Sequence, residues 1–421
     1  MGNLMRQYWI PALHSADLPA KDGAPLRVRL LCENLVAFRN TGGRIGLIDH
    51  VCPHRCASLF FGRNEENGLR CLYHGWKFDV DGRCVEVPNE PPGSKFNEQI
   101  RVAAYPCIEK NGIVWTYMGP DRDNPPPLPE PGWAMVEPGR RGALRYQRAC
   151  NWLQAMEGDF DSSHLSFLHL AFDPKLQGAA ESKKAGIDYY RNIARMDKQP
   201  LLEVRDTDVG VMYGARRDSG AGKFYWRVTQ FMLPFYTSVP GFGGKNRDKV
   251  WVPLDDEHTM VWEPHWSSTR ALSEEEQKGW KDRVPPSGFL ADTDDWLGRA
   301  RFAANAGNDY LLDRERQKNL NFSGMENVTP IQDGAMQESM GPICDRRREH
   351  LGASDAAIVY MRRRLLNAAK TLHEKSLAPP GVEDPAFYHK HGDQMLLGEN
   401  DSWTEHYAAK MKQDYAALVS R

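Results

Sequence analysis

Two short segments that each contain one cysteine and one histidine constrain this chain more than any other feature. Cys52 and His54 form a Cys-x-His pair, and Cys71 and His74 form a Cys-x2-His pair. Glycine and aromatic residues around the pairs favour tight turns over helix. Two cysteines and two histidines suit either one zinc ion or one iron–sulfur cluster. In a zinc finger the cysteines share one loop, whereas here each loop supplies one residue of each kind, which suits a two-iron cluster.

The segments "CPHR" and "CLYHGWKF" closely resemble the metal-binding loops of a Rieske iron–sulfur domain, in the form used by bacterial ring-hydroxylating oxygenases. The resemblance implies that Cys52 and Cys71 bind one iron of a [2Fe-2S] cluster and that His54 and His74 bind the other. Two imidazoles in place of two thiolates raise the reduction potential by several hundred millivolts. One residue departs from the family, because Cys56 stands where these oxygenases usually have glycine. We expect Cys56 to be a free, packed thiol.

The length and the local patterns predict more than one domain. A chain of 421 residues exceeds one ordinary hydrophobic core. Its first part consists of β-branched runs separated by Asp-Gly and Asn-Gly turn signals, which predicts hairpins. Six prolines between Pro120 and Pro131 then predict a stiff connector. We predict a Rieske domain at residues 1–120, a proline-rich linker at 121–145, and a catalytic domain with a C-terminal helical extension at 146–421.

The remainder of the chain is predicted to mix strands and helices. Aromatic and β-branched runs at 224–240 and 248–266 predict long strands. Ser273 and Glu276 form a capping box, which predicts the start of a helix. Apolar residues at helical spacing predict another helix over 354–378, before a Pro-Pro stop.

A second candidate metal site lies in the segment "NWLQAMEGDFDSSHLSFLH". Asp161 and His164 are three residues apart and would share one face of a helix. His169 is five residues beyond His164, so a local distortion or a helix end must bring the two imidazoles together. Taken alone, two histidines on an amphipathic segment need not bind metal. The segment, however, resembles the Asp-x2-His-x4-His motif of the same oxygenases, which implies that His164 and His169 bind mononuclear iron.

The same resemblance gives Asp161 a role and supplies a third ligand. Asp161 would accept a hydrogen bond from a Rieske histidine of the adjacent subunit, although an acid at a helix start is also favourable by itself. The segment "NVTPIQDGAMQESMGPICDRRREH" resembles the C-terminal signature of the phthalate dioxygenase branch, which implies Asp333 as the third ligand. Glu338 and Asp345 are rivals in that segment. Two histidines and one carboxylate leave iron positions open for dioxygen.

The resemblance covers nearly the whole chain and implies an α+β protein. An all-β Rieske domain would precede a helix-grip catalytic domain (SRPBCC, Bet v1-like) with an antiparallel sheet. It also implies the oxygenase component of a multi-component system, fed by a separate NAD(P)H-dependent reductase with flavin and iron–sulfur groups. The chain itself has no Gly-x-Gly-x2-Gly motif after a strand. Members of the family assemble as trimers, and some phthalate-type members stack two trimers into a hexamer.

Phthalate-type oxygenases act on aromatic carboxylates, so the predicted reaction is cis-dihydroxylation of a phthalate-like acid. One alternative is oxidative O-demethylation or monooxygenation of a methoxylated aromatic acid. An alternative of another class is an electron-transfer protein with a vestigial second site. A carboxylate substrate requires a cation, ideally a guanidinium. The candidates are Arg216, Arg217 and Arg227, although each could instead be a surface or ion-pair arginine.

Charge and hydropathy give no sign of nucleic-acid binding, membrane insertion or secretion. The formal net charge of −2 gives no electrostatic reason to expect nucleic acid. No apolar run approaches the roughly 20 residues needed to span a bilayer. The start of the chain has no signal-peptide pattern. We therefore expect a cytoplasmic protein that does not associate with membranes.

Overall fold

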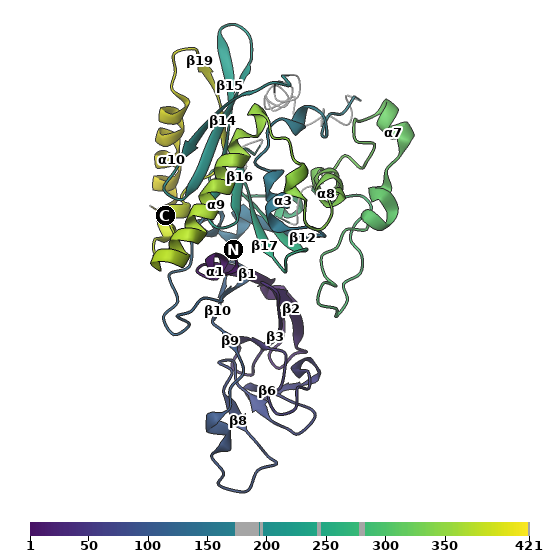
Figure 1. Cartoon of the computed structure of the whole chain (residues 1–421), viewed down its shortest axis with the longest axis vertical. Helices are drawn as coiled ribbons and strands as arrows, with labels where there is room; N and C mark the ends of the chain where they lie inside the picture. The colour runs from purple at the N-terminus through teal and green to yellow at the C-terminus, as the bar shows by residue number, and fades with distance from the viewer. Residues whose placement is uncertain (173–192, 194–196, 242–245, 278–282, 420–421) are drawn as a thin grey trace. The chain divides into compact units, whose positions relative to one another are not determined.

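The computed structural model describes residues 1–172, 193, 197–241, 246–277 and 283–419 (Figure 1). The chain divides into two compact units. The first unit consists of Met1–Leu128, Val252–Asp255 and Asp292–Arg299. The second unit consists of Pro129–Trp251, Asp256–Ala291 and Ala300–Arg421.

Three small antiparallel sheets make up most of the first unit. One sheet has the order β1-β11-β10, with β1 (Trp9–His14), β10 (Cys107–Lys110) and β11 (Ile113–Tyr117). Another has the order β2-β3-β4-β9, with β2 (Leu26–Leu30), β3 (Glu33–Arg39), β4 (Ile45–Asp49) and β9 (Ala104–Tyr105). The last has the order β5-β6-β7-β8, with β5 (Arg63–Glu65), β6 (Gly68–Arg70), β7 (Lys77–Phe78) and β8 (Cys84–Glu86). The predicted Asn-Gly hairpin joins β10 to β11, and the Asp-Gly turn lies between β7 and β8.

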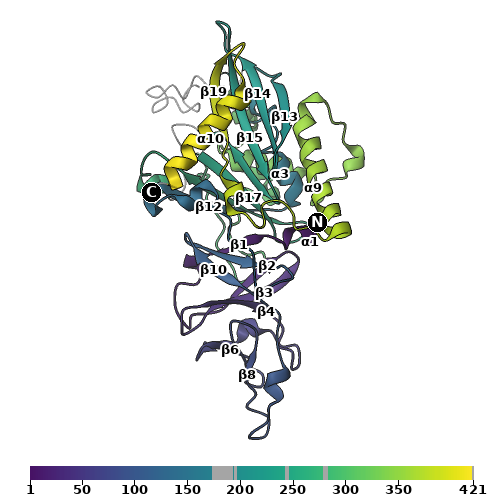
Figure 2. The same cartoon turned by 90° about the vertical axis from the view of Figure 1, so that its left-hand side faces the viewer.

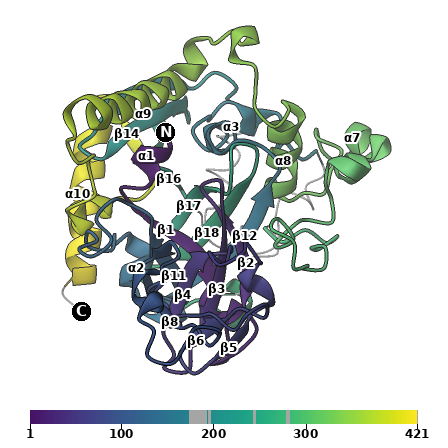
Figure 3. The same ribbon diagram turned by 60° about the horizontal axis from the view of Figure 1, so that its bottom comes forward.

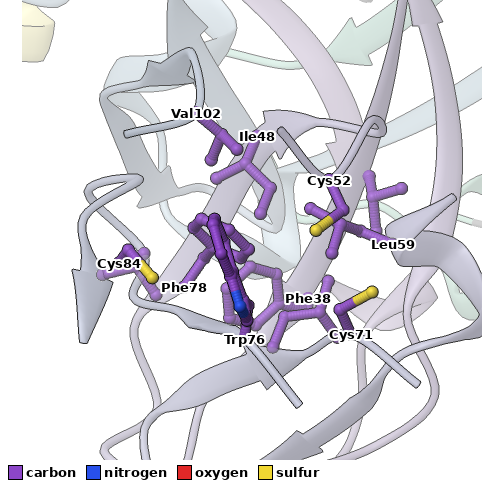
Figure 4. Close-up of a cluster of buried hydrophobic side chains, with 12 residues drawn as sticks. Phe38, Ile48, Cys52, Leu59, Cys71, Trp76, Phe78, Cys84 and Val102 are labelled. Atoms are coloured by element: carbon purple, nitrogen blue, oxygen red, sulfur yellow. The ribbon is translucent and has the colours of Figure 1, made fainter. Parts of the chain in front are cut away.

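A buried cluster of side chains lies among the strands of this unit. Figure 4 shows Cys52 and Cys71 at one end of the cluster and Cys84 at the other. Aromatic and aliphatic side chains fill the space between them, including Phe38, Ile48, Leu59, Trp76, Phe78 and Val102. The two predicted cysteine ligands are therefore part of the hydrophobic core.

An eight-stranded antiparallel sheet dominates the second unit (Figure 1). Seven strands follow the order β12-β18-β17-β16-β15-β14-β13, and β19 pairs with β15. The strands are β12 (Arg141–Arg148), β13 (Leu201–Asp206), β14 (Gly210–Asp218), β15 (Lys223–Met232), β16 (Tyr236–Val239), β17 (Asn246–Pro253), β18 (Thr259–Trp266) and β19 (Asp393–Gly398). The predicted strands at 224–240 and 248–266 correspond to β15 to β18.

Helices pack on this sheet and on one another. Their bounds are α2 (Gly132–Met135), α3 (Trp152–Glu157), α6 (Glu274–Gln277), α7 (Arg314–Asn319), α8 (Thr329–Ser339), α9 (Ala356–Lys375) and α10 (Trp403–Val419). Helix α9 packs on β13 and β14, whereas α10 packs on β19 (Figure 2). Helix α10 also contacts α2. Helix α10 buries one side-chain stripe at a spacing of four residues, which includes Trp403, Tyr407, Met411 and Tyr415. Helices α3 and α8 contact each other (Figure 3).

These elements confirm the predicted fold class. The first unit is rich in short strands, and the second combines an antiparallel sheet with helices. The capping box of α6 forms as predicted, because Glu276 N–H donates to the Ser273 hydroxyl at 3.2 Å and Ser273 N–H donates to the Glu276 carboxylate at 2.9 Å. Among the helices that the structure describes, none combines the length and the apolar character that a membrane span requires.

Candidate metal centres

The first candidate centre lies in two turns that are closed in the same way. Each turn begins at a cysteine, Cys52 or Cys71, whose backbone N–H donates to the carbonyl five residues later at 2.8 Å. The residue four positions after the cysteine is Cys56 in one turn and Gly75 in the other. Its backbone N–H donates to the cysteine carbonyl, at 2.9 Å and 3.0 Å respectively. Each turn therefore presents one cysteine and one histidine from a backbone that is hydrogen-bonded to itself.

The four side chains of these turns meet in pairs, thiol with thiol and imidazole with imidazole. Burial raises the pKa of the Cys52 thiol to about 11, and the neighbouring Cys71 thiol acts in the same direction. The rings of His54 and His74 have centroids 4.3 Å apart. Their Nδ1 atoms are buried, and neither has a hydrogen-bond partner among the residues that the structure describes. Buried unpartnered nitrogens require an explanation such as a bound metal, and this donor set fits a two-iron cluster with mixed ligands.

Cys56 differs from the expectation in one respect. It is free, as predicted, but it is exposed and not packed. Its φ is +61°, and the corresponding Gly75 of the other turn has a φ of +77°. A positive φ costs a residue with a side chain roughly 1–2 kcal/mol, a cost that glycine avoids. Glycine would therefore suit position 56, because the first turn requires a positive φ there.

The second candidate centre begins just after α3. The predicted helical face shared by Asp161 and His164 is not present, because α3 ends at Glu157 and His164 opens a separate 3-10 turn, η5 (His164–Ser166). His169 follows in the irregular turn after η5. The predicted local departure from helix is thus what allows the two imidazoles to approach each other.

Contacts with the sheet hold the segment between α3 and η5 in place. The carboxylate of Asp159 accepts hydrogen bonds from Lys249 Nζ at 2.5 Å and from the Thr237 hydroxyl at 2.8 Å. The ring of Phe160 packs edge-on against Tyr213, with centroids 4.9 Å apart. Strands β14, β16 and β17 therefore fix the start of the segment that carries the histidines.

The structure brings His164, His169 and Asp333 together. The Oδ1 atom of Asp333 lies 3.0 Å from His169 Nε2 and 3.8 Å from His164 Nε2. One donor atom from each residue lies within 4.8 Å of the other two. Donor atoms that bind one ion at about 2.1 Å lie no more than about 4.2 Å apart. Small side-chain movements would therefore let all three bind a single ion.

The outer nitrogens of both imidazoles already have partners. His164 Nδ1 lies 3.1 Å from an oxygen of Asp161, and His169 Nδ1 lies 2.6 Å from the side-chain oxygen of Gln332. The buried Nε2 of His169 is close to Asp333 but not aligned for a hydrogen bond. Burial alone would raise the pKa of the Asp333 carboxyl, yet His169 and His164 hold that pKa well below its usual value. The Nε2 atoms and an ionised carboxylate thus converge on one point, which fits a divalent cation.

An apolar cavity of about 750 Å³ adjoins this point. Asp161, His164 and Asp333 form part of its wall. Half of the remaining lining residues are aliphatic, aromatic or thioether: Phe167, Leu168, Leu312, Phe322, Met325, Met336, Met340, Leu351 and Ile358. The other half is mainly polar or charged and includes Arg314 and Arg362. A cavity of this size and character suits a small, largely apolar organic ligand.

Comparisons with known proteins agree with this geometry. The Rieske [2Fe-2S] domain family matches residues 8–106, and the family described as LigXa C-terminal domain like matches residues 116–420. The 3-chlorobenzoate-3,4-dioxygenase oxygenase subunit of Comamonas testosteroni is 39% identical over 398 residues, covering 92% of this chain and 89% of that protein. The phthalate 4,5-dioxygenase oxygenase subunit of Pseudomonas putida is 41% identical over 374 residues, covering 87% of this chain and 82% of that protein.

The chain belongs to the Rieske aromatic ring-hydroxylating oxygenases. A solved structure of an NdmA variant from Pseudomonas putida CBB5 with caffeine has the same fold as this Rieske oxygenase, with a TM-score of 0.58 at 18% identity. The alignment covers 95% of this chain and 98% of the chain in that structure. The protein is the oxygenase component of a multi-component system and takes its electrons from a partner protein. Its cofactors are a Rieske [2Fe-2S] cluster and a mononuclear iron.

The other two candidates for the third ligand of this Rieske oxygenase, Glu338 and Asp345, form contacts elsewhere. Glu338 accepts a hydrogen bond from the Tyr310 hydroxyl at 2.7 Å. Asp345 pairs with Arg347 at 2.8 Å. Neither belongs to the group that contains His164, His169 and Asp333 among the described residues.

Strand register separates the three candidate arginines. Arg217 and Arg227 lie on β14 and β15 at positions that share one face of the sheet with Tyr213, whereas Arg216 lies on the opposite face, with its guanidinium over the ring of Phe224 at 4.5 Å. None of the three is among the described residues that line the cavity.

The two arginines on the shared face differ in their partners. Arg217 is buried and donates to the carbonyl and hydroxyl of Ser162, at 2.9 Å and 3.0 Å. Arg227 is also buried, at 7% exposure. No side chain that the structure describes forms a hydrogen bond or an ion pair with its guanidinium. The Tyr213 phenol, whose pKa burial raises to about 12, lies within electrostatic range of both Arg227 and Asp161.

The sequence did not single out Gln332, although this residue contacts a candidate ligand directly. The signal available was its position next to Asp333 in the "QD" pair. That adjacency does not reveal that the amide lies against His169, because consecutive residues of a helix point about 100° apart.

Proposed function

We propose that this oxygenase performs the cis-dihydroxylation of a phthalate-like aromatic carboxylic acid. The observation that carries the proposal is the group of His164, His169 and Asp333 beside an apolar cavity of about 750 Å³. Two relatives that are similar over most of their length are named as phthalate and 3-chlorobenzoate dioxygenase subunits, which supports an aromatic acid as the substrate.

The proposed ligand roles follow from the donor sets. Cys52 and Cys71 would bind one iron of the cluster, and His54 and His74 the other. In the second centre His164, His169 and Asp333 would hold the mononuclear iron. When bound, this iron supplies the activation of dioxygen, for which the cluster delivers electrons. Three protein ligands leave coordination positions open, as dioxygen chemistry beside a substrate requires.

Asp161 is proposed to connect the two centres of neighbouring subunits in a trimer or a stacked hexamer. One of its oxygens faces His164 Nδ1 at 3.1 Å, and the other accepts the backbone N–H of Ser163 at 2.7 Å. The side chain remains 27% exposed and also lines the cavity. It therefore has capacity for a further hydrogen bond from a Rieske histidine of the adjacent subunit. Leu72 and Tyr73, beside His74, are exposed apolar side chains that suit such a contact.

Arg227 is the strongest of the three candidates for the cation that receives the substrate carboxylate. No described side chain pairs with its buried guanidinium, an arrangement that is costly by itself, and a carboxylate would offer it two parallel hydrogen bonds. Arg217 is already engaged by Ser162, and Arg216 lies on the other face of the sheet. The neighbourhood that Arg227 shares with Tyr213 and Asp161 also favours it.

The test is a reconstitution with a separate NADH-dependent flavin and iron–sulfur reductase. Benzoate, phthalate, methoxybenzoates and biaryl acids are supplied under labelled dioxygen, and the products are identified by mass. Incorporation of two labelled oxygen atoms into a dihydrodiol acid is the expected result. Release of formaldehyde from a methoxybenzoate would replace dihydroxylation with O-demethylation. Reduction of the cluster without substrate-dependent oxygen uptake for any acid would overturn the proposal in favour of an electron-transfer protein.

A further inference from the structure

We propose that Gln332 is a positioning residue that fixes the tautomer of His169, so that the Nε2 lone pair of this ring faces the metal. The inference rests on the proposed ligand set of the mononuclear iron. Gln332 lies on α8 directly before Asp333, and it is 2% exposed. Its side-chain oxygen lies 2.6 Å from His169 Nδ1. One turn of α8 would thus supply both a ligand and the residue that orients another ligand.

The orientation of the Gln332 amide is determined by its nitrogen. Nε2 donates to the Ser323 hydroxyl oxygen at 3.0 Å and to the carbonyl of Glu326 at 3.1 Å. A flipped amide would place its oxygen against the Glu326 carbonyl, which cannot donate. The amide oxygen must therefore face His169, and an amide oxygen can only accept a hydrogen bond.

The Ser323 hydroxyl is itself oriented by its neighbours. Its oxygen accepts the backbone N–H of Met325 at 3.3 Å, and its proton can go to the side-chain oxygen of Asn321 at 3.4 Å. Asn321 is fixed in turn, because its amide nitrogen donates to the carbonyl of Met325 at 2.9 Å and its oxygen accepts the N–H of Gly324 at 2.7 Å. Each donor in this series of hydrogen bonds has an acceptor, which fixes the orientation of the Gln332 amide.

The last hydrogen bond of this series, between Gln332 and His169, determines which ring nitrogen of His169 carries a proton. Because the Gln332 oxygen only accepts, Nδ1 must carry the proton, and the neutral ring then keeps its lone pair on Nε2. That atom is buried, 3.0 Å from Asp333 Oδ1, and not aligned for a hydrogen bond. Whenever the ring is neutral, it is therefore held in the tautomer whose Nε2 can bind a metal.

The two imidazoles of the centre are consequently oriented by different chemistry. His164 faces a carboxylate, Asp161, whereas His169 faces a neutral amide. A carboxylate partner increases the electron donation of an imidazole ligand more than an amide does. Gln332 thus gives orientation with little added charge, in a buried site that already contains the Asp333 carboxylate.

The experiment uses the full chain with its cluster intact, after a chelator has removed the mononuclear iron. Co(II) is titrated anaerobically, and its absorption reports the affinity. We expect Gln332→Met to weaken Co(II) binding by about 10- to 100-fold, the range found for partners of metal-bound histidines. Gln332→Glu, which keeps an acceptor at Nδ1, should bind Co(II) at least as tightly as the unchanged protein. The matched control is Gln394→Met on β19, which removes the hydrogen bond accepted from the Tyr225 hydroxyl and the one donated to the Gly241 carbonyl.

A second variant and a second readout separate positioning from general stability. Ser323→Ala removes an acceptor of the Gln332 amide without touching His169, and we expect a smaller loss of affinity. The ¹⁵N signals of His169 in labelled iron-free protein, assigned by their loss in His169→Ala, should show this ring protonated at Nδ1, and Gln332→Met should convert it to a mixture of tautomers.

The outcomes distinguish this inference from the proposed ligand set. Unchanged Co(II) affinity and ¹⁵N shifts in Gln332→Met, with affinity lost in His169→Ala, would overturn the role of Gln332 and leave the ligand set standing. An equal loss in Gln394→Met would also overturn it, because the effect would then be general. Undiminished affinity in His169→Ala would instead overturn the ligand set.

Discussion

The two centres of this Rieske oxygenase take their predicted ligands from the chain in different ways. In the first, all four ligands come from two turns between residues 52 and 74, each closed by its own backbone hydrogen bonds. In the second, His169 and its partner Gln332 are separated by 163 positions, and the orienting contacts come from a third segment around Ser323. The first centre is local, so its spacing is visible in the sequence. The second depends on how α8 packs.

Buried polar contacts hold α8 against the rest of the second unit. Arg148, on β12, is 2% exposed and donates to the side-chain oxygen of Gln337 at 3.2 Å and to the carbonyl of Pro330. Gly334 lies against this guanidinium, and a Cβ there would meet Arg148 Nη1 at 2.6 Å. Glycine inside a helix is unfavourable by about 0.5–1 kcal/mol. Here it permits the close approach that places Asp333 beside the histidines.

The largest effect is expected from a substitution that removes one metal and leaves the other in place. Asp333→Ala should remove the mononuclear iron while leaving the cluster, because all four predicted cluster ligands belong to the first unit and Asp333 belongs to the second. Substrate turnover should fall by more than about 10³-fold, since the metal supplies several kcal/mol of stabilisation. Iron analysis alongside the visible absorption of the cluster checks both parts. Retention of the mononuclear iron would move the third ligand elsewhere, with Glu338→Ala and Asp345→Ala as the matched comparisons.

Replacing one imidazole ligand of the cluster should change the first centre and leave the second unchanged. His74→Cys should keep the two-iron cluster but lower its reduction potential by at least about 100 mV, because a thiolate adds negative charge. The mononuclear iron content should stay unchanged. Redox titration followed by electron paramagnetic resonance measures the potential. His50→Cys, two residues before Cys52 and outside the predicted ligand set, is the control, and an equal shift there would contradict the assignment.

The difference between local and distant contacts also decides what the sequence could predict. The Cys and His pairs and the His164–His169 segment were recognisable because each motif is short. The all-β start and the mixed α+β remainder followed from hairpin signals and strand patterns, whereas the helix-grip architecture followed only from the family resemblance. The orientation of Gln332 was not predictable, since it depends on Ser323, nine residues earlier along a turn that only the tertiary structure places. The exposure of Cys56 was missed for a related reason, because the backbone conformation of its turn is not evident from a cysteine.

Substrate recognition is expected to belong to the second centre alone. Arg227→Gln should raise the KM for the carboxylate substrate by about 10- to 100-fold, since a hydrogen-bonded charge pair is worth about 1.5–3 kcal/mol. Arg227→Lys should recover part of that loss. The rate at which the reductase reduces the cluster should not change. Steady-state kinetics and stopped-flow absorption measure the two quantities. Arg216→Gln, on the other face of the sheet, is the matched control and should leave the KM near its original value.

The dependence of the second centre on remote packing can be tested through Arg148. Arg148→Met removes the hydrogen bonds to Gln337 and Pro330, and we expect a loss of about 2–3 kcal/mol in the stability of the second unit. The mononuclear iron should dissociate more readily, because Asp333 is carried by α8. The cluster absorbance serves as the internal control and should persist. Equal loss of both metals would show that the two centres are not independently maintained.

The smallest effect is expected on the stability of the two turns that form the first centre. Cys56→Gly should stabilise the first turn by about 1 kcal/mol or less, because glycine relieves the positive φ but gains freedom in the unfolded chain. At the corresponding position of the other turn, Gly75→Ala should destabilise more strongly, because its φ is +77° and a Cβ would meet Pro88 Cγ at 2.8 Å. The rate of cluster bleaching on heating measures both changes. Faster bleaching in Cys56→Gly would mean that the exposed thiol makes a favourable contact that outweighs its backbone strain. In that case the two turns would match in geometry but not in energy.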